Sequence, residues 1–292
     1  MSPPTHFELN EFAWPYHEIC ATYGIPNYKE VNPTTFNMVT FPFLFGVMFG
    51  DIGHGTLLFA FAIYVCLRAD YLKANVPSLK LIVKIRYLLL LMGFFAVYCG
   101  FIYNDMMAMP LNLFGSCYEN VDSVSSTSVV RLDDCVYPFG FDPKWYVSSY
   151  EITFFNSFKM KFAVIIGVAQ MALGVCMKGA NAIAQGASID FIFEFIPQII
   201  FLLGLFGFMD VLIIVKWLTD WTGREGDAPS IITQMINNII KLGIIDETAL
   251  LWSDDVQTFI SEFLLVLCLC MVPLMLFVKP IYLNSLNKKK SQ

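Results

Sequence analysis

The stretch FPFLFGVMFGDIGHG, from Phe41 to Gly55, places an aspartate and a histidine inside the longest apolar segment of the chain. Asp51 and His54 are the only acidic or basic residues among the 32 residues from Phe36 to Leu67. An ionisable group at membrane depth is costly, so it indicates an ion path, a proton relay or a buried pair. The sequence therefore raises the question of a membrane protein that handles protons.

The composition is that of a membrane protein. Hydrophobic residues make up 57% of the chain and charged residues 14%, against about 25% charged residues in a soluble domain. The net charge of −6 and the lack of a basic stripe interleaved with aromatic residues argue against a nucleic-acid partner. Residues 1–30 are polar and carry no early apolar core, so we expect the first apolar segment, rather than a cleaved signal peptide, to direct insertion into the bilayer.

The apolar runs predict an all-α fold, a polytopic transmembrane helical bundle of six membrane segments with an acidic luminal loop. We expect the segments at about 36–49, 54–67, 85–103, 160–177, 195–215 and 259–278. One helix over 36–67 would be about 48 Å long, too long for a hydrocarbon layer of about 30 Å. Because Gly50, Gly53 and Gly55 allow a break, two short segments are preferred, and one long tilted helix is the alternative.

Basic residues predict the orientation of the chain, because cytosolic loops carry an excess of lysine and arginine. The loop 68–86 holds five bases and one acid, and the tail holds Lys279, Lys288, Lys289 and Lys290 without an acid, so both are expected in the cytosol. Residues 105–151 hold seven acids and two bases, and residues 216–255 seven acids and three bases, so both are expected in the lumen. Six segments with both termini cytosolic satisfy all four regions.

The pattern of apolar segments and charged loops divides the chain into three parts. Residues 1–35 are interpreted as a cytosolic linker with an interfacial helix over 7–23, residues 36–283 as the transmembrane domain, and residues 284–292 as a basic cytosolic tail. A second interfacial helix is predicted over 230–242, where apolar side chains at helical spacing lie opposite polar ones. Its apolar residues are Ile232, Met235, Ile236, Ile239 and Ile240, and its polar residues are Asn237, Asn238 and Lys241.

Cysteine and histidine usage limits the possible chemistry. Cys117 and Cys135 are the only cysteines of the acidic loop, and an oxidising lumen favours a disulfide between them, with two free thiols as the alternative. The chain has no CxxC motif and only three histidines, so neither a metal site nor a catalytic triad is expected, and no cofactor is implied. We therefore expect a protein that is not itself an enzyme.

Asp51, His54 and Asp105 are the candidates for a proton path, because all three are expected near the luminal membrane face. The structural alternative is that Asp51 caps a helix and His54 bonds a backbone carbonyl. Lys159 and Lys161 open the fourth segment on the luminal side against the charge rule, and we expect them to pair with acids of the loop.

Three further ionisable residues lie near the ends of the fourth and fifth segments. Glu194 and Asp210 bracket the fifth segment and are interpreted as interfacial or interhelical contacts, with Asp210 reaching water. Lys178 is expected to extend toward the cytosolic interface.

Several stretches, taken in order, resemble subunit a of the vacuolar-type proton-translocating ATPase (V-ATPase), and together they cover nearly the whole chain. They are YGIPNYKEVNPTTF (Tyr23–Phe36), TFPFLFGVMFGDIGHG (Thr40–Gly55), LLMGFFAVYCGFIYND (Leu90–Asp105), YPFGFDPKW (Tyr137–Trp145), NSFKMKFAVIIG (Asn156–Gly167), FIPQIIFLLGLFGFMD (Phe195–Asp210), Lys216-Trp217 and VPLMLFVKP (Val272–Pro280).

The resemblance implies a stator that faces a rotating ring of proteolipid c subunits and supplies two aqueous half-channels, while other subunits hydrolyse ATP. It implies an integral membrane protein of acidic organelles (vacuole, lysosome, endosome, Golgi or contractile vacuole), with the c-ring, other membrane-sector subunits and the lipid bilayer as partners. It also implies peripheral-stalk and regulatory subunits as partners, through a cytosolic domain that family members carry before this region.

The chain departs from the family pattern in one respect that matters for function. Family members carry arginines that meet the ring carboxylates on two last helices, and this sequence has no arginine after Arg224, so those arginines are assigned to no residue here. By the family pattern, Asp51 and Asp105 match positions near the polar pathway. We interpret the chain first as a six-helix part of the stator. The alternative is a truncated paralogue or an independent proton-coupled channel or transporter.

Overall fold

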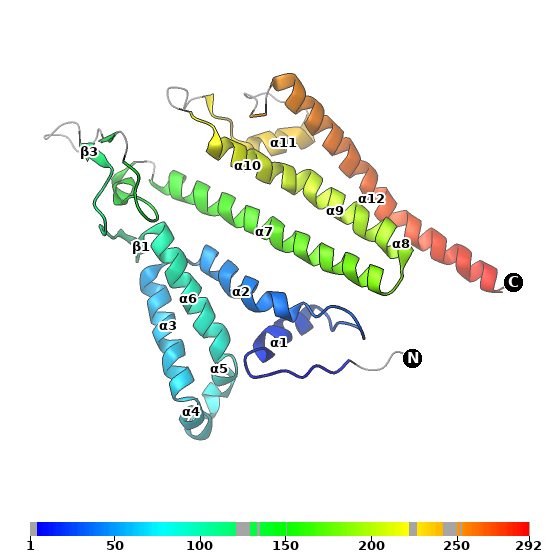
Figure 1. Cartoon of the computed structure of the whole chain (residues 1–292), viewed down its shortest axis with the longest axis horizontal. Coiled ribbons are helices and arrows are strands. Elements are labelled where there is room, and N and C mark those ends of the chain that lie inside the picture. Colours follow the sequence, from blue (N-terminus) through cyan, green and yellow to red (C-terminus); the bar gives the residue numbers. More distant parts are fainter. Residues whose placement is uncertain are drawn as a thin grey trace. The chain divides into compact units, whose positions relative to one another are not determined.

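The computed structural model describes residues 5–120, 129–132, 135–149, 151–221, 227–241, 250–251 and 253–291 (Figure 1). The chain forms two compact units, Met1–Ala163 and Val164–Gln292, and the boundary between them falls inside one long helix. Most described residues are helical, as the sequence predicts. Of the acids of the two predicted luminal regions, Asp122, Asp133, Asp134, Glu225, Asp246 and Glu247 lie outside the described residues.

The first unit consists of helices and two small antiparallel hairpins. Its helices are α1 (Trp14–Tyr23), α2 (Thr34–Met48), α3 (Ile52–Leu67), α4 (Ala69–Asn75), the 3-10 helix η1 (Pro77–Leu79), α5 (Lys80–Lys84), α6 (Arg86–Tyr103), the 3-10 helix η2 (Pro143–Val147) and the start of α7 (Glu151–Ala184). The hairpins pair β1 (Asp105–Met106) with β2 (Met109–Pro110), and β3 (Tyr118–Asn120) with β4 (Val129–Arg131).

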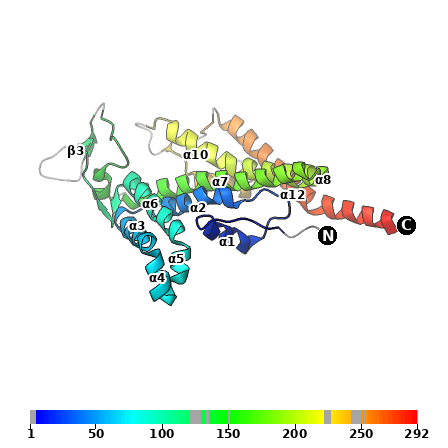
Figure 2. The ribbon, with the colours of Figure 1, turned by 60° about the horizontal axis from the view of Figure 1, so that its bottom comes forward.

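Helices α3 and α6 run antiparallel and lie side by side in both ribbon views (Figures 1 and 2). Glycines permit the close approach, as is common between membrane helices. A Cβ atom on Gly100 would lie 2.5 Å from the backbone nitrogen of Ile52, and one on Gly93 would lie 2.7 Å from the backbone nitrogen of Phe59. The backbones of the two helices therefore approach closely at one end of the pair and in its middle.

The structure has the helix break that the glycines predict. Helix α2 ends at Met48 and α3 begins at Ile52, so residues 49–51 separate two helices of 15 and 16 residues. At 1.5 Å per residue, α2 is about 22 Å long, shorter than a hydrocarbon core of about 30 Å. Asp51 stands at the N-cap of α3, as the structural alternative for this residue anticipates.

Four helical stretches of the described residues are long and apolar enough to cross a membrane. They are Arg86–Tyr103, Glu151–Ala184, Ser188–Leu218 and Asp254–Ser285. A fifth crossing results if α3 and α4, which are bent by 77° at their junction, count as one span. Because α2 falls short of a full crossing by length, the count of six membrane segments stays a prediction.

In the second unit a helical rod with two π-helical turns packs against a long helix. The rod consists of α8 (Ser188–Asp190), the π-helix η3 (Phe191–Phe195), α9 (Ile196–Leu202), the π-helix η4 (Leu203–Gly207) and α10 (Phe208–Leu218). Helix α12 (Asp254–Ser291) packs on α9 and on both π turns. Because α12 is helical as far as Ser291, the predicted basic tail extends the last helix, and Gln292 lies outside the described residues.

Helix α11 (Ile231–Ile240) lies within the second predicted interfacial helix, and Leu242 lies outside the described residues. Most of its apolar residues, including Ile232, Ile236 and Ile239, are exposed, which suits a helix lying on a lipid surface. Two polar side chains of this helix are covered by protein. Gln234 and Asn238 are buried, and each leaves side-chain polar atoms without a hydrogen-bond partner.

The N-terminal segment packs against α2 and the start of α6. Glu11 forms ion pairs with Arg86 and with Lys73, and the rings of Phe12 and Tyr87 lie 5.8 Å apart. Tyr16 of α1 is fully buried. The region expected to be a cytosolic linker is therefore bound to the loop that is expected on the same side.

Candidate functional site

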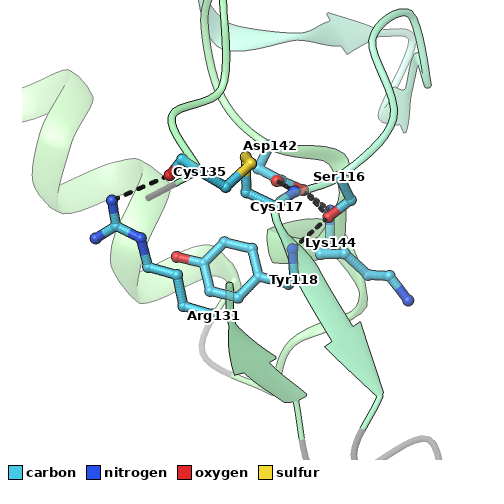
Figure 3. The surroundings of a disulfide bond; sticks show 7 residues. All are labelled: Ser116, Cys117, Tyr118, Arg131, Cys135, Asp142 and Lys144. Carbon is cyan, nitrogen blue, oxygen red and sulfur yellow. Dashed lines mark hydrogen bonds between the residues drawn. A yellow bond between two sulfur atoms is a disulfide. The ribbon is translucent and has the colours of Figure 1, made fainter. Parts of the chain in front are cut away.

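The loop after α6 is organised around one buried carboxylate. Asp142 is 5% exposed and accepts hydrogen bonds from the Ser116 hydroxyl at 2.7 Å, from the Cys117 backbone N–H at 2.8 Å and from the Lys144 backbone N–H at 2.9 Å (Figure 3). A carboxylate that accepts several N–H and O–H donors fixes the backbone that carries them. The sequence analysis did not identify Asp142, and the only local signal is its position directly before Pro143.

A disulfide joins Cys117 and Cys135 in the structure, and their Cα atoms lie 5.5 Å apart (Figure 3). This distance lies in the usual range for disulfides. Cys117 is buried beside Asp142, and the Cys135 carbonyl accepts a hydrogen bond from Arg131 at 3.4 Å. The two cysteines singled out in the sequence are therefore the pair that closes this loop.

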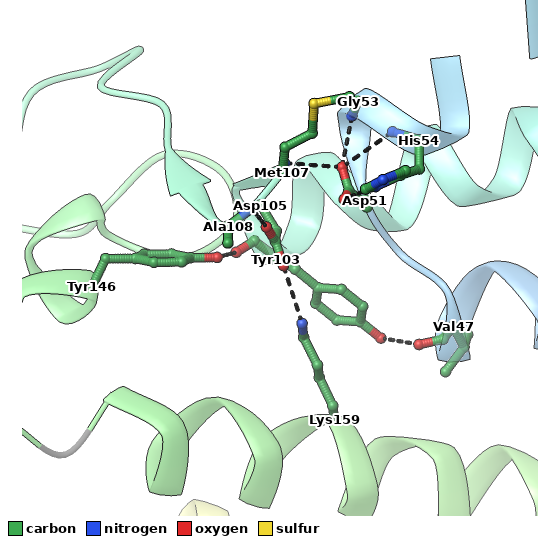
Figure 4. A network of polar contacts seen from close by, with 10 residues as sticks. All are labelled: Val47, Asp51, Gly53, His54, Tyr103, Asp105, Met107, Ala108, Tyr146 and Lys159. Atoms are coloured by element: carbon green, nitrogen blue, oxygen red, sulfur yellow. Dashed lines mark hydrogen bonds and ion pairs between the residues drawn. The ribbon is translucent and has the colours of Figure 1, made fainter. Parts of the chain in front are cut away.

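Asp51 connects the start of α3 to the turn after α6. Its Oδ1 atom accepts hydrogen bonds from the backbone N–H of Gly53 at 2.7 Å, of His54 at 3.4 Å and of Met107 at 3.1 Å (Figure 4). The first two bonds cap α3, while the third crosses to a residue 56 positions away. Burial acts to raise the pKa of Asp51, but the hydrogen bonds from His54, Met107 and Gly53 outweigh it and hold the pKa below its ordinary value.

His54 contacts the second oxygen of the Asp51 carboxylate. Its Nδ1 atom is 2.6 Å from Asp51 Oδ2, so the imidazole bonds a carboxylate and not the backbone carbonyl of the structural alternative. With Nδ1 as donor to Asp51, the Nε2 atom is left to accept or donate a proton. The His54 side chain is 56% exposed and that of Asp51 18%, so the pair has an accessible end and a covered end.

Asp105 bonds Ala108, which follows Met107 in the turn after α6. Its Oδ1 atom accepts a hydrogen bond of 3.0 Å from the Ala108 backbone N–H, directly after the Met107 N–H that Asp51 holds. Met107 and Ala108 both have positive φ, at 51° and 63°, which is uncommon for residues other than glycine. A carboxylate at the N-cap of α3 and a carboxylate in β1 thus hold the two left-handed residues of one tight turn.

Lys159 of α7 supplies a positive charge to this group. Its Nζ atom lies 3.5 Å from Asp105 Oδ2, which confirms the expectation that Lys159 pairs with an acid of the loop. The same ammonium lies 4.7 Å from the centre of the Tyr103 ring, within the range of a cation–π contact. Asp51, His54, Asp105 and Lys159 therefore belong to one polar region, which we call the junction (Figure 4).

Two tyrosines complete the junction, and the sequence analysis missed both. The Tyr103 hydroxyl donates to the Val47 carbonyl at 2.8 Å, and the Tyr146 hydroxyl donates to the Tyr103 carbonyl at 3.3 Å. Burial, followed by the nearby carboxylates Asp105, Glu151 and Asp51, raises the pKa of Tyr146, so its hydroxyl keeps its proton.

Asn104 ends α6 and turns the chain into the loop. It is 3% exposed, has a left-handed φ of 53°, and bonds the backbone of Leu111 in both directions and the carbonyl of Phe141. Left-handed asparagine is a common helix C-cap. Gly140 has a φ of 73°, and a Cβ there would lie 2.6 Å from the Ile102 carbonyl oxygen, so these contacts require glycine next to Phe141.

Other ionisable residues lie outside the junction. Glu194 accepts from Lys178 at 2.5 Å and from Lys279 at 2.9 Å, which confirms its interpretation as an interhelical contact. Lys178 of α7 therefore pairs with the neighbouring helix that carries Glu194. Any contact of its side chain with the cytosolic interface would be additional. The expectation that Asp210 reaches water is wrong for one of its oxygens, because Oδ1 is buried without a hydrogen-bond partner.

Comparisons with known proteins give a consistent picture. The whole chain, residues 1–292, matches the model of the V-type ATPase 116kDa subunit family. It is 39% identical to "Vacuolar proton translocating ATPase 100 kDa subunit" of Dictyostelium discoideum, over 98% of this chain and 36% of that protein. It is 38% identical to "V-type proton ATPase subunit a1" of Arabidopsis thaliana, over 100% of this chain and 35% of that protein. It is 37% identical to "V-type proton ATPase 116 kDa subunit a 3" of Homo sapiens, over 99% of this chain and 37% of that protein. The chain spans little more than a third of the length of these relatives.

Proposed function

Because the chain belongs to the V-type ATPase 116kDa subunit family, we propose that it forms part of the membrane stator of a V-type proton ATPase. In this role it supports the proton half-channels beside the proteolipid c-ring and contacts other membrane-sector subunits. ATP hydrolysis takes place on other subunits, and this chain carries no catalytic step. The observation that carries the proposal is the match over all 292 residues to relatives named as V-type proton ATPase subunits.

Within that role, the junction is proposed to line or border the luminal end of the proton path. It brings together an ionised carboxylate, an exposed imidazole and a second carboxylate paired with a lysine. An imidazole can accept and donate protons, and fixed carboxylates raise the local concentration of protons. The hydroxyls of the buried Tyr103 and the half-buried Tyr146 are engaged with backbone carbonyls, so their role is to hold the junction in place.

The charge pattern supports a luminal placement of the junction. The junction adjoins the acidic loop, whereas the basic loop 68–86 lies at the opposite ends of α3 and α6. We propose that the Cys117–Cys135 disulfide forms in the oxidising lumen of an acidic organelle, and that both termini of this region are cytosolic.

Substituting Asp51 and Asp105 by asparagine, in the complete subunit within its complex, tests the role of the junction. Asparagine keeps the N-cap of α3 at Asp51 and an acceptor for Ala108 at Asp105, so the local fold is retained while the charge is lost. We expect each variant to assemble and to show a several-fold lower initial rate of ATP-driven acidification in membrane vesicles. The matched control is Asp70→Asn, which changes an exposed carboxylate of the basic loop and should leave the acidification rate unchanged.

Normal acidification by both junction variants would refute the role in the proton path but not the stator assignment. The stator assignment has a separate test. An affinity tag on the subunit should recover the proteolipid and the ATP-hydrolysing subunits from solubilised native membranes. Recovery of the chain without them would instead favour the alternative of an independent channel or transporter.

A further inference from the structure

An open groove runs along the second unit between α7, the rod that contains α9, and α12. Figure 1 shows α7 running lengthwise beside α9. The groove has a volume of about 420 Å³. Its lining is apolar except at one end and consists of Met171, Gly174, Val175, Lys178, Gln198, Phe201, Leu202 and Met275. We propose that this groove binds one acyl chain of an anionic phospholipid, whose headgroup lies at the lysine end.

The groove is a defined site because α7 contacts the rod on both sides of it. At one side Ile165 packs against the apolar cluster of Phe208, Leu212 and Ile213. At the other side Gly179 lies so close to the Phe195 ring that a Cβ there would be 2.6 Å from it. Between these contacts the two helices separate, and the groove occupies the space.

The lining suits a hydrocarbon chain. The helices that form the groove have the length and composition of membrane spans, so the side chains along it are expected to face acyl chains. Gly174 leaves the middle of the α7 side without a side chain, and a Cβ on it would meet no protein atom within 4 Å. Leu202 closes the floor and is 9% exposed.

The polar end of the groove carries an ammonium group with a hydrogen-bond donor to spare. Lys178 Nζ donates to Glu194 at 2.5 Å and to Gln198 Oε1 at 3.2 Å. An ammonium has three donors, so these two contacts, the ones the structure describes for Lys178, leave one donor for a headgroup oxygen. The Lys178 side chain is 44% exposed, which keeps that donor accessible.

The charge at this end favours an anionic headgroup. Lys279 of α12 pairs with both Asp190 and Glu194, and three further lysines, at positions 288–290, follow along the same helix. Lys178 and Lys279 balance the charges of Asp190 and Glu194 beside the groove, and the lysines that follow in the sequence of α12 add positive charge beyond this end. Basic groups between membrane helices and just beyond their cytosolic ends bind anionic lipid headgroups, and the cytosolic leaflet contains such lipids.

Photo-crosslinking in the assembled complex tests the site. The purified complex is reconstituted into phosphatidylcholine vesicles that contain either phosphatidylserine or phosphatidylcholine with a diazirine in the acyl chain, and labelled peptides are mapped by mass spectrometry. We expect phosphatidylserine to label the peptides that contain Met171 and Met275 several-fold more than phosphatidylcholine does.

Two leucine substitutions on α7 separate groove occupancy from effects on the helix. Gly174→Leu places a side chain in the groove, its Cβ meets no protein atom within 4 Å, and it should reduce labelling several-fold. Gly167→Leu, two helical turns earlier, also points into open space but lies outside the groove lining, so labelling should stay at the parent level. Equal labelling in the two variants would overturn the proposal.

Lys178→Gln tests the headgroup contact. Glu194 keeps its ion pair with Lys279 in this variant, so no carboxylate is left unpaired. Loss of one lysine should lower the preference for phosphatidylserine over phosphatidylcholine about fivefold. Equal labelling of the parent chain by both lipids, or no labelling because a protein segment fills the groove, would refute the proposal. This inference does not depend on the proton-path role, because Asp51→Asn should leave the lipid labelling unchanged.

Discussion

The hydroxyl of Tyr103, at the end of α6, donates a hydrogen bond of 2.8 Å to the carbonyl of Val47, in the last turn of α2. The last carbonyls of a helix lack partners within the helix, so this bond satisfies one of them. Tyr103 is 1% exposed, and its ring stacks on Phe141 while Lys159 lies over the ring. One side chain therefore joins the helix break at Asp51 to the loop that carries Asp105.

Replacing Tyr103 by phenylalanine isolates the contribution of this bond, because the ring contacts are retained. The loss of a buried hydrogen bond that leaves a carbonyl unsatisfied should destabilise the subunit by about 1–3 kcal/mol. The midpoint of thermal unfolding of the purified complex is the measurement. Tyr98→Phe, on the exposed face of the same helix, is the control and should leave the midpoint unchanged. An equal response to the two substitutions would show that the bond to Val47 contributes nothing.

Gly100→Ala should push α3 away from α6. The added Cβ would lie 2.5 Å from the Ile52 nitrogen and 2.6 Å from the Asp51 carbonyl carbon, and both are backbone atoms that cannot turn aside. Overpacking of this kind costs about 1–3 kcal/mol, and here it also displaces the Asp51 cap. We expect less assembled subunit in the membrane, as measured by quantitative immunoblotting.

The matched control for Gly100→Ala is Gly167→Ala, because a Cβ at Gly167 meets no atom within 4 Å. Alanine has the higher helix propensity, so this control should match or slightly exceed the parent level. Parent-level assembly of Gly100→Ala would show that α3 and α6 pack less closely than the structure indicates.

The attachment of the N-terminal segment should depend on pH. The hydrogen bond and charge of Arg86 hold the pKa of Glu11 below its ordinary value, with a smaller contribution from Lys73. A carboxyl with a lowered folded pKa stabilises the fold above its ordinary pKa, and this stabilisation is lost as the pH falls through the lowered value.

Hydrogen exchange of the α1 amides measures this attachment. Protection should be steady near neutral pH and fall under acid conditions below the ordinary pKa of glutamate. Glu11→Gln should reduce protection at neutral pH and remove that part of the acid dependence. If the Glu11→Gln variant kept the full acid dependence of α1 protection, a group other than Glu11 would cause that dependence.

The disulfide loop should depend on Asp142. Asp142→Ala leaves the Ser116 hydroxyl and the backbone N–H groups of Cys117 and Lys144 without their acceptor in a buried place. We expect a larger fraction of chains with free thiols at Cys117 and Cys135, seen as two extra additions of a maleimide–polyethylene glycol without reductant. Asp105→Ala, which removes a carboxylate with no contact to either cysteine among the described residues, should not add them. If the two variants gave the same free-thiol fraction, Asp142 would not hold this loop.

The sequence predicted the elements that depend on periodicity and spacing. The three glycines around Asp51 predicted the helix break, and the structural alternative for Asp51 predicted its position as the N-cap of α3. The position of Lys159 at a helix end that is expected in the lumen predicted its acidic partner.

Contacts between distant segments could not be predicted from the sequence. The Met107–Ala108 turn depends on two left-handed residues that are not glycine, and Asp142 carries no local signal for the backbone it organises. Tyr103 appears in the sequence as one aromatic residue of an apolar run, and only the tertiary structure shows its bond to Val47. The number of membrane segments depends on whether the 15-residue α2 crosses the bilayer, which its length leaves open.

Labelling of single introduced cysteines tests most directly whether the junction faces the lumen while the basic loop and the C-terminal end of α12 face the cytosol. The sites are Asn75→Cys in the basic loop, Leu283→Cys in α12 and Met109→Cys beside the junction, all exposed in the structure. In sealed vesicles with the cytosolic face outward, a membrane-impermeant maleimide should label the first two at once and Met109→Cys only after detergent is added. Labelling of Met109→Cys in intact vesicles, or of Asn75→Cys and Leu283→Cys on opposite faces, would contradict the account.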